Sequence, residues 1–112
     1  MKNARLIPCA FALLCLSALT AQPGALDIDF NTDGIVTTAI GTGNDFGLSA
    51  AMQPDGRIVV AGYSLIDTIT VIAVVRYNTD GTLDNSFSAD GMVTTAIGAG
   101  HDYGQSVAMQ PD

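Results

Sequence analysis

The 112-residue chain contains no tryptophan and no glutamate, and it has only four lysine and arginine residues. Its 11 acidic residues are therefore all aspartate, which favours turns, whereas glutamate favours helices. Together with 12 glycines, this composition predicts a chain built from strands and turns rather than from helices. The length allows one domain at most.

Cysteine is absent after residue 21, because Cys9 and Cys15 both lie near the N-terminus. Residues 1–21 begin with a basic stretch, continue with an apolar run and end on small residues, which is the order of a secretory signal. The apolar run is shorter than the roughly 20 residues of a transmembrane helix. We therefore expect a signal peptide over residues 1–21, with a buried N-terminal helix as the alternative. Such a chain is secreted, periplasmic or on the cell surface.

Removal of this signal would leave a mature chain, residues 22–112, without any cysteine. Disulfides, thiol catalysis and thiolate metal sites are then excluded. Only Arg57 and Arg76 would remain against 11 aspartates, which gives a formal charge of −9 (2 − 11). A surface of that sign repels phosphate groups, so neither nucleic acid nor a membrane is an expected partner, whereas a cation is compatible with it.

The sequence repeats itself at an offset of 57 residues (83 − 26). Residues 26–55 and 83–112 align without a gap and are identical at about two-thirds of their positions. We therefore divide the β-repeat region into a first repeat at residues 26–82 and a partial second repeat at residues 83–112. Asp-Gly pairs recur at equivalent places, and this dipeptide is typical of tight turns because glycine accepts a positive φ.

Short β-prone runs lie between these turns, about four in each period, at residues 35–40, 48–52, 57–63 and 69–77. The last run, ITVIAVVRY, is nearly all apolar, but it has about half the length of a membrane span. No helical periodicity appears after residue 22. The pattern predicts an all-β fold with a β-propeller-like repeat of about four short antiparallel strands, following an N-terminal signal helix. At roughly one and a half repeats, we expect the propeller to be incomplete.

Two segments resemble the delta-60 repeat, a bacterial β-propeller family of unknown function. They are QPDGRIVVAG at residues 53–62 and RYNTDGTLDNSF at residues 76–87. The resemblance covers nearly all of the mature chain, about residues 26–112. Members of the family usually carry glycine after the final phenylalanine of this motif, where this chain has Asn31 and Ser88. The resemblance implies a propeller with many repeats and carries little information on activity.

The aspartate-rich turns are candidate cation sites. Asp29, Asn31 and Asp33 have the D-x-N-x-D-G spacing that opens a calcium-binding loop. Such a loop closes with a bidentate acid at its twelfth position, which is Ile40 here. We therefore favour a repeat-linking turn, with calcium as the alternative, and we expect no other cofactor.

Two further motifs are compatible with chemistry but favour structural roles. Residues 41–47 form a glycine-rich loop, yet they lack the spacing of a phosphate-binding loop, and Asp45 would oppose an anion. His101, the only histidine, would serve a hydrolase if a serine and an aspartate met it in space. The first repeat has Asn44 at the equivalent position, which favours a turn residue.

These features favour a non-enzymatic module outside the cytoplasm that acts in adhesion or interaction. Its expected partners are proteins or further repeats, self-association included. The alternatives are a calcium-binding structural module, a hydrolase that uses His101, and a truncated fragment of a larger propeller. Arg76 ends the most apolar run, and we expect it to pair with Asp80 or Asp84 rather than with a ligand.

Overall fold

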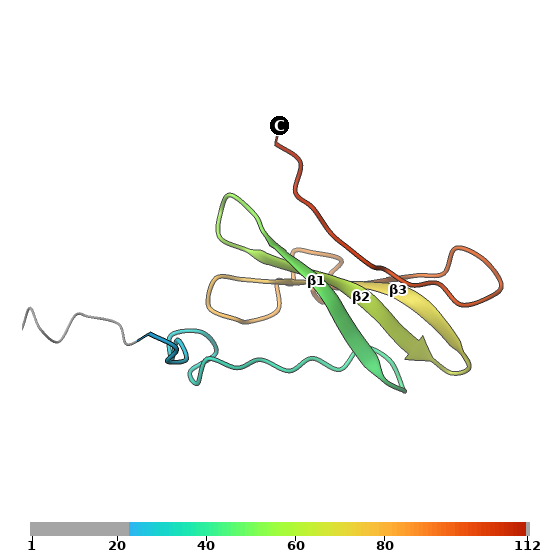
Figure 1. The fold of residues 1–112 in the computed structure, drawn as a ribbon, viewed down its shortest axis with the longest axis horizontal. Coiled ribbons are helices and arrows are strands. Elements are labelled where there is room, and N and C mark those ends of the chain that lie inside the picture. The colour runs from blue at the N-terminus through green and yellow to red at the C-terminus, as the bar shows by residue number, and fades with distance from the viewer. Residues whose placement is uncertain (1–22, 112) are drawn as a thin grey trace, which may run out of the picture.

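The computed structural model describes residues 23–111. Their four strands form one antiparallel sheet (Figure 1). Neighbours along the chain are neighbours in the sheet, and the strands are β1 (Asp45–Met52), β2 (Ile58–Ile66), β3 (Ile69–Tyr77) and β4 (Met92–Thr95). This arrangement confirms the predicted all-β fold of short antiparallel strands. None of these residues forms a helix that is long and apolar enough to cross a membrane. The predicted signal peptide at residues 1–21 lies outside the described residues.

The β2–β3 hairpin is the centre of the sheet. The two strands pair along their whole length, from Ile66 opposite Ile69 at the turn to Ile58 opposite Tyr77 at the other end. In the two-residue turn between them, Asp67 has a φ of 54°, a conformation that aspartate adopts more readily than most residues. Both strands are rich in β-branched residues, which pack well on a pleated surface. They supply all the buried apolar side chains of the described residues: Val59, Ala61, Val71, Ala73, Val75 and Tyr77.

Small residues allow β1 to approach β2 closely. Gly62 lies opposite Gly47 in β1 and opposite Ala73 in β3. A Cβ atom at position 62 would collide with the Phe46 carbonyl group, so only glycine fits there. The β1–β2 register shifts between Gly47 and Ser49, which places a β-bulge beside this contact.

One face of the sheet is crossed by residues 35–43, which run below the strands in Figure 1. This first face carries the side chains of Val75 and Tyr77, because alternate residues of a strand point to the same side. The hydroxyl groups of Thr38 and Tyr77 are 2.6 Å apart. The segment thus covers the most deeply buried part of β3.

The opposite face is crossed by residues 101–107, which run on the other side of the strands (Figure 1). This second face carries Tyr63 and Thr70. The Asp102 N–H group donates to the Thr70 carbonyl at 2.8 Å. The Tyr103 ring packs edge-to-face on Tyr63 with the ring centroids 4.9 Å apart. Each face is therefore covered by an extended segment that belongs to no strand.

The strand predicted at residues 35–40 is wrong, because these residues are extended but unpaired. At the 57-residue offset, residues 35–38 correspond to β4 and have nearly the same sequence. In the second copy, β4 pairs with one edge of β3, and β2 occupies the other edge. Since a strand has two edges, residues 35–40 find no free edge on β3 and lie on its face instead.

The other three predicted strands are present, and two of them have shifted ends. β1 begins at residue 45 rather than 48, β2 spans Ile58–Ile66 rather than residues 57–63, and β3 has the predicted bounds. The sheet crosses the predicted boundary between residues 82 and 83, because β4 comes from the second period. The sequence period and the sheet are therefore out of phase.

The turns at residues 27–34 and 84–91 share two internal backbone hydrogen bonds. In each, an aromatic N–H group donates to an aspartate carbonyl, and a glycine N–H group donates to the aromatic carbonyl. The distances are 3.0 and 2.9 Å for Phe30–Asp27 and Phe87–Asp84, and 2.7 and 2.8 Å for Gly34–Phe30 and Gly91–Phe87. Asn31 and Ser88, which stand where the delta-60 family usually has glycine, have φ values of 51° and 54°. The glycine preference of the family thus coincides with a left-handed position.

We predict that Ser88→Gly stabilises the chain by about 0.5 kcal/mol, because glycine adopts a positive φ without the strain that a Cβ atom brings. Asn85→Gly is the matched control, since residue 85 lies in the same turn without a positive φ. There, glycine only adds flexibility to the unfolded chain and should destabilise. Thermal unfolding of both variants measures the difference. A lower melting temperature for Ser88→Gly would contradict the prediction.

Candidate functional site

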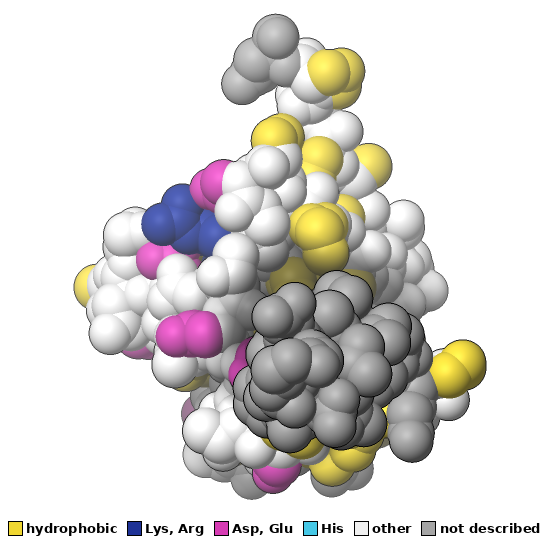
Figure 2. All heavy atoms as spheres, turned by 90° about the vertical axis from the view of Figure 1, so that its left-hand side faces the viewer, with side chains coloured by type: hydrophobic (Ala, Val, Ile, Leu, Met, Phe, Trp, Pro, Cys, Tyr) yellow, Lys and Arg dark blue, Asp and Glu magenta, His cyan; other side chains and the backbone are white. Residues whose placement is uncertain are grey.

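The most highly connected polar group of the described residues is the Asp84 carboxylate, at one end of the sheet. Its Oδ2 atom lies 2.7 Å from Arg76 Nε and 3.0 Å from Arg57 Nε. These are the two basic residues of the described chain, and Figure 2, which views the molecule from this end, shows the basic side chains gathered beside acidic ones. We call Arg57, Arg76 and Asp84 the arginine clamp.

The backbone places these three residues together. Arg57 immediately precedes β2 and Arg76 is the last residue but one of β3, so the antiparallel register brings both to the same end. The Arg76 N–H group donates to the Gly91 carbonyl at 2.9 Å, and the Asp84 N–H group donates to the Arg76 carbonyl at 3.0 Å. The turn at residues 84–91 is thus fixed to β3 by its backbone as well as by the ion pairs.

The carboxylate of Asp84 is buried, with only 5% of the side chain exposed, and both of its oxygens have partners. Its Oδ1 atom accepts hydrogen bonds from the Ser86 hydroxyl at 2.6 Å and from the Ser86 N–H group at 3.0 Å. The Ser86 hydroxyl lowers the pKa of Asp84 most strongly, burial raises it, and the Ser86 N–H group and the two arginines lower it further. The net pKa lies below the ordinary range, so the carboxylate stays charged.

The expected ion pair of Arg76 with a turn aspartate is present, and its partner is Asp84. Asp80, the other candidate, accepts hydrogen bonds from the Thr82 N–H and hydroxyl groups instead. The Arg76 guanidinium also lies over the Phe87 ring, 4.7 Å from its centroid. Sequence reasoning missed Arg57 as the second arginine, because only the β2–β3 register shows that it reaches the same carboxylate.

The calcium candidates Asp29, Asn31 and Asp33 lie together in the turn at residues 27–34. Asp33 Oδ1 accepts a hydrogen bond from the Ile35 N–H group at 2.9 Å, and the Asn31 side-chain amide donates to the Ile35 carbonyl at 2.6 Å. Within residues 23–111, no group of three or more histidine, cysteine or acidic residues is placed to hold a metal ion. The geometry is that of a hydrogen-bonded turn, and calcium binding stays a hypothesis.

In the glycine-rich loop at residues 41–47, the carboxylate of Asp45 takes the place that a bound anion would need. Asp45 accepts hydrogen bonds from the N–H groups of Ile40 and Gly41 at 2.9 and 3.2 Å. Partial burial raises the pKa of Asp45, but these N–H groups lower it, and the net pKa lies below the ordinary range. Asp102 makes the same contacts with Ile97 and Gly98 in the second copy. N–H groups that a phosphate would need are thus already occupied.

His101 and Asp102 are not arranged as a catalytic pair. His101 Nδ1 accepts a hydrogen bond from the Thr70 N–H group at 3.0 Å, so this nitrogen carries no proton to donate to a carboxylate. The Asp102 carboxylate is directed to the N–H groups of residues 97 and 98. Both residues instead attach the segment 101–107 to the second face of the sheet.

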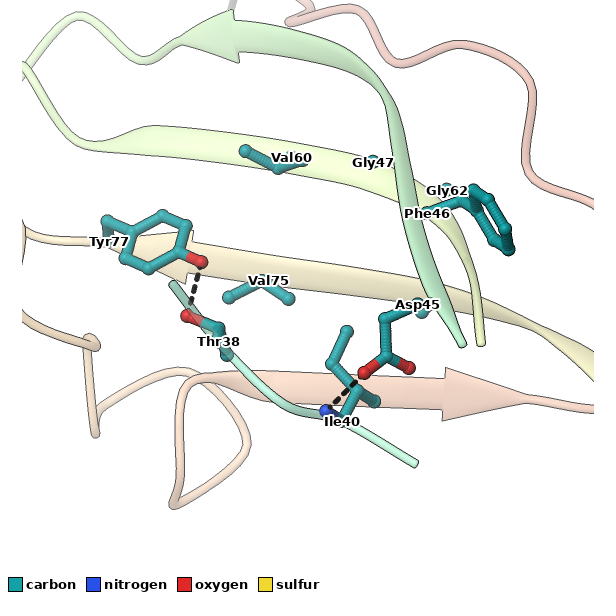
Figure 3. A pocket seen from close by; sticks show the side chains of 10 residues that line it. Thr38, Ile40, Asp45, Phe46, Gly47, Val60, Gly62, Val75 and Tyr77 are labelled. Atoms are coloured by element: carbon teal, nitrogen blue, oxygen red, sulfur yellow. Dashed lines mark hydrogen bonds between the residues drawn. The ribbon is translucent and has the colours of Figure 1, made fainter. Parts of the chain in front are cut away.

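A cavity of about 150 Å³ lies between residues 35–40 and the first face of the sheet (Figure 3). Its polar groups are already paired: the Tyr77 and Thr38 hydroxyls point to each other, and Asp45 points to the Ile40 N–H group. The remaining lining is mostly apolar or glycine, namely Phe46, Gly47, Val60, Gly62, Ala73 and Val75. The cavity is smaller than ordinary ligand pockets of about 300–1,000 Å³.

The arginine clamp lies within a segment that matches a known family. Residues 53–87 match a family model described as a domain of unknown function (DUF5122) beta-propeller. This segment is similar to a β-propeller repeat. The match confirms the resemblance to the delta-60 repeat, which is a related family, and it covers β2, β3 and all three clamp residues. No curated protein and no solved structure matches the chain.

We predict that Asp84→Asn lowers the melting temperature by about 5 °C or more near pH 7, because Arg76 loses its charged partner and Arg57 keeps only its ion pair with Asp55. The folded pKa of Asp84 lies below its unfolded value of about 4, so the ionised carboxylate stabilises the fold above that pH. This stabilisation is lost as the pH falls through the folded pKa.

The difference in melting temperature between wild type and Asp84→Asn should therefore shrink between about pH 5 and about pH 2. Asp29→Asn is the control, because its carboxylate accepts no hydrogen bond from the described residues. A difference for Asp84→Asn that stays constant over this range would show that the carboxylate charge is not what stabilises the sheet end.

Calcium should bind the turn at residues 27–34 no more tightly than about millimolar, because Ile40 supplies no closing carboxylate. Calorimetric titration of the chain with calcium measures this affinity. Micromolar binding that disappears in Asp33→Ala would refute the structural-turn interpretation.

Proposed function

We propose that this chain is a non-enzymatic interaction module that acts outside the cytoplasm. Its propeller repeat presents sheet faces that bind further repeats or other proteins. The observation that supports this proposal most directly is the way in which both faces are covered. Residues 35–38 correspond to β4 and residues 102–109 to β1 at the 57-residue offset, so sequences equivalent to the outer strands of the sheet pack on its faces.

Each covering segment is one strand wide and leaves apolar side chains exposed. Phe46 and Tyr103 are 46% and 49% exposed, and Ile97 is 74% exposed. Other large exposed apolar residues among those described are Leu26, Ile28, Ile35, Leu48 and Met52. Exposed apolar area of this extent marks an interaction surface when it is contiguous.

Contiguous apolar surface is present on the second face. Phe46 stacks on Tyr63 with ring centroids 4.9 Å apart, and Tyr103 meets Tyr63 edge-to-face at the same distance. Aromatic residues of this kind are enriched at protein interfaces because they bury a large area and retain a polar tip. We therefore place the interaction surface on the second face, around Phe46, Tyr63 and Tyr103.

The chain without residues 1–21 should self-associate, since its own copies carry the same apolar faces. Sedimentation over a wide range of concentrations measures this. Tyr103→Asp should weaken association at least about tenfold by placing a charge in the aromatic cluster. Thr68→Asp is the matched control, because it adds the same charge in the exposed β2–β3 turn.

A monomer at every concentration, with a sharp unfolding transition that does not depend on concentration, would contradict the proposal. The chain would then be a self-sufficient domain whose exposed faces need no partner. Equal loss of association in Tyr103→Asp and Thr68→Asp would also count against the second face, because general charge repulsion would explain it.

A further inference from the structure

The turn at residues 27–34 is a second copy of the turn that holds the arginine clamp. Both turns have the same two internal backbone hydrogen bonds, and the aspartate at their start accepts an N–H group two residues later, at 3.0 Å in each case. The first turn also donates the Asn31 N–H group to the Asp80 carbonyl of the same chain at 2.7 Å. Asp27 in the first turn is therefore equivalent to Asp84 in the second in sequence and in local geometry. The second turn shows what such a structure binds.

Three polar groups of the second turn, besides the Ser86 hydroxyl and the Phe87 ring that contact Arg76, bind the end of the β2–β3 hairpin. The Asp84 N–H group and the Gly91 carbonyl bind the two backbone polar groups of Arg76, at 3.0 and 2.9 Å. The Asp84 Oδ2 atom binds the guanidinium groups of Arg76 and Arg57. The complete ligand of the turn is thus the end of a β-hairpin with one arginine on each strand.

The equivalent groups of the first turn have no partner among residues 23–111. They are the Asp27 N–H group, the Gly34 carbonyl and the Asp27 Oδ2 atom. Asp27 is exposed, and its neighbours Leu26 and Ile28 are 59% and 70% exposed. Both arginines of the described chain are already bound to Asp84, so they do not fill this site.

We propose that the turn at residues 27–34 is a docking site for the end of a β-hairpin that carries an arginine on each strand. The occupant is a β-propeller repeat whose arginines are not bound by a turn of its own. A second copy of this chain is a poor occupant, because its own Asp84 competes at the high effective concentration of an intramolecular contact. The proposal rests on the proposed function and names the chemistry of one partner.

The test uses a fluorescent peptide of residues 57–77, which carries Arg57 and Arg76 but lacks the 84–91 turn, and circular dichroism first establishes that the peptide forms β-structure. The peptide carries a soluble tag and is titrated with the full chain purified after export, and anisotropy is measured. Saturable binding is expected. Binding should weaken at least about tenfold when both peptide arginines are replaced by glutamine, and it should weaken at high salt.

The matched chain variants are Asp27→Asn and Asp33→Asn, which remove the same charge from the same turn. Asp33 is the control, because its equivalent Asp90 binds the Met92 N–H group and neither arginine. Asparagine at residue 27 keeps an oxygen for the Asp29 N–H group, so the turn stays intact, as circular dichroism should confirm. Only Asp27→Asn should lose the peptide, at least about tenfold, while sedimentation of the chain stays unchanged. If only the proposed self-association through the second face fails, the sedimentation result changes and peptide binding stays intact.

Three results would overturn the docking site. They are the absence of saturable binding, equal binding of the peptide with and without its arginines, and equal affinity of Asp27→Asn and the wild type. The last two would mean that the peptide adds to a sheet edge or face without using the turn.

Discussion

The end of the sheet depends on one buried carboxylate that two strands share. Asp84 binds Arg57 before β2 and Arg76 at the end of β3, and its backbone fixes the following turn, from which β4 begins. Removal of Asp84 leaves the half-buried guanidinium of Arg76 without a charged partner, and such a loss costs more than the pair itself contributes. The clamp therefore couples the hairpin, the turn and the fourth strand in one unit.

The exclusive use of aspartate has a structural reason that unites the turns. Six aspartates accept a hydrogen bond from the backbone N–H group two residues later, at 2.9–3.0 Å, namely Asp27, Asp33, Asp55, Asp80, Asp84 and Asp90. This contact needs a carboxylate one carbon from the backbone Cα, and glutamate is one methylene too long. Turns that use this contact have no place for glutamate, so six of the 11 aspartates follow from the turn chemistry.

Much of the fold was predictable from local sequence, and the failures have a common cause. β3 has the bounds predicted from its β-branched run, and the Asp-Gly pairs lie in turns, because both signals act over a few residues. Residues 35–38 and β4 have nearly the same sequence, yet one is unpaired and the other is a strand. The difference is set by which edge of β3 is free, and no local pattern contains that information. Arg57 was missed for the same reason, since its contact with Asp84 depends on strand register.

The phase difference between period and sheet has a consequence for how arrays of such repeats change in length. The sheet takes three strands from the first period and its fourth from the second, so the boundary between these periods lies within the sheet. Recombination that inserts or deletes one whole period preserves every blade, wherever the breakpoint falls, because the following period supplies an equivalent fourth strand. An exchange that breaks the period leaves β3 with an open edge, which is a site for pairing with other chains. The interlocked strands therefore favour inheritance in whole periods.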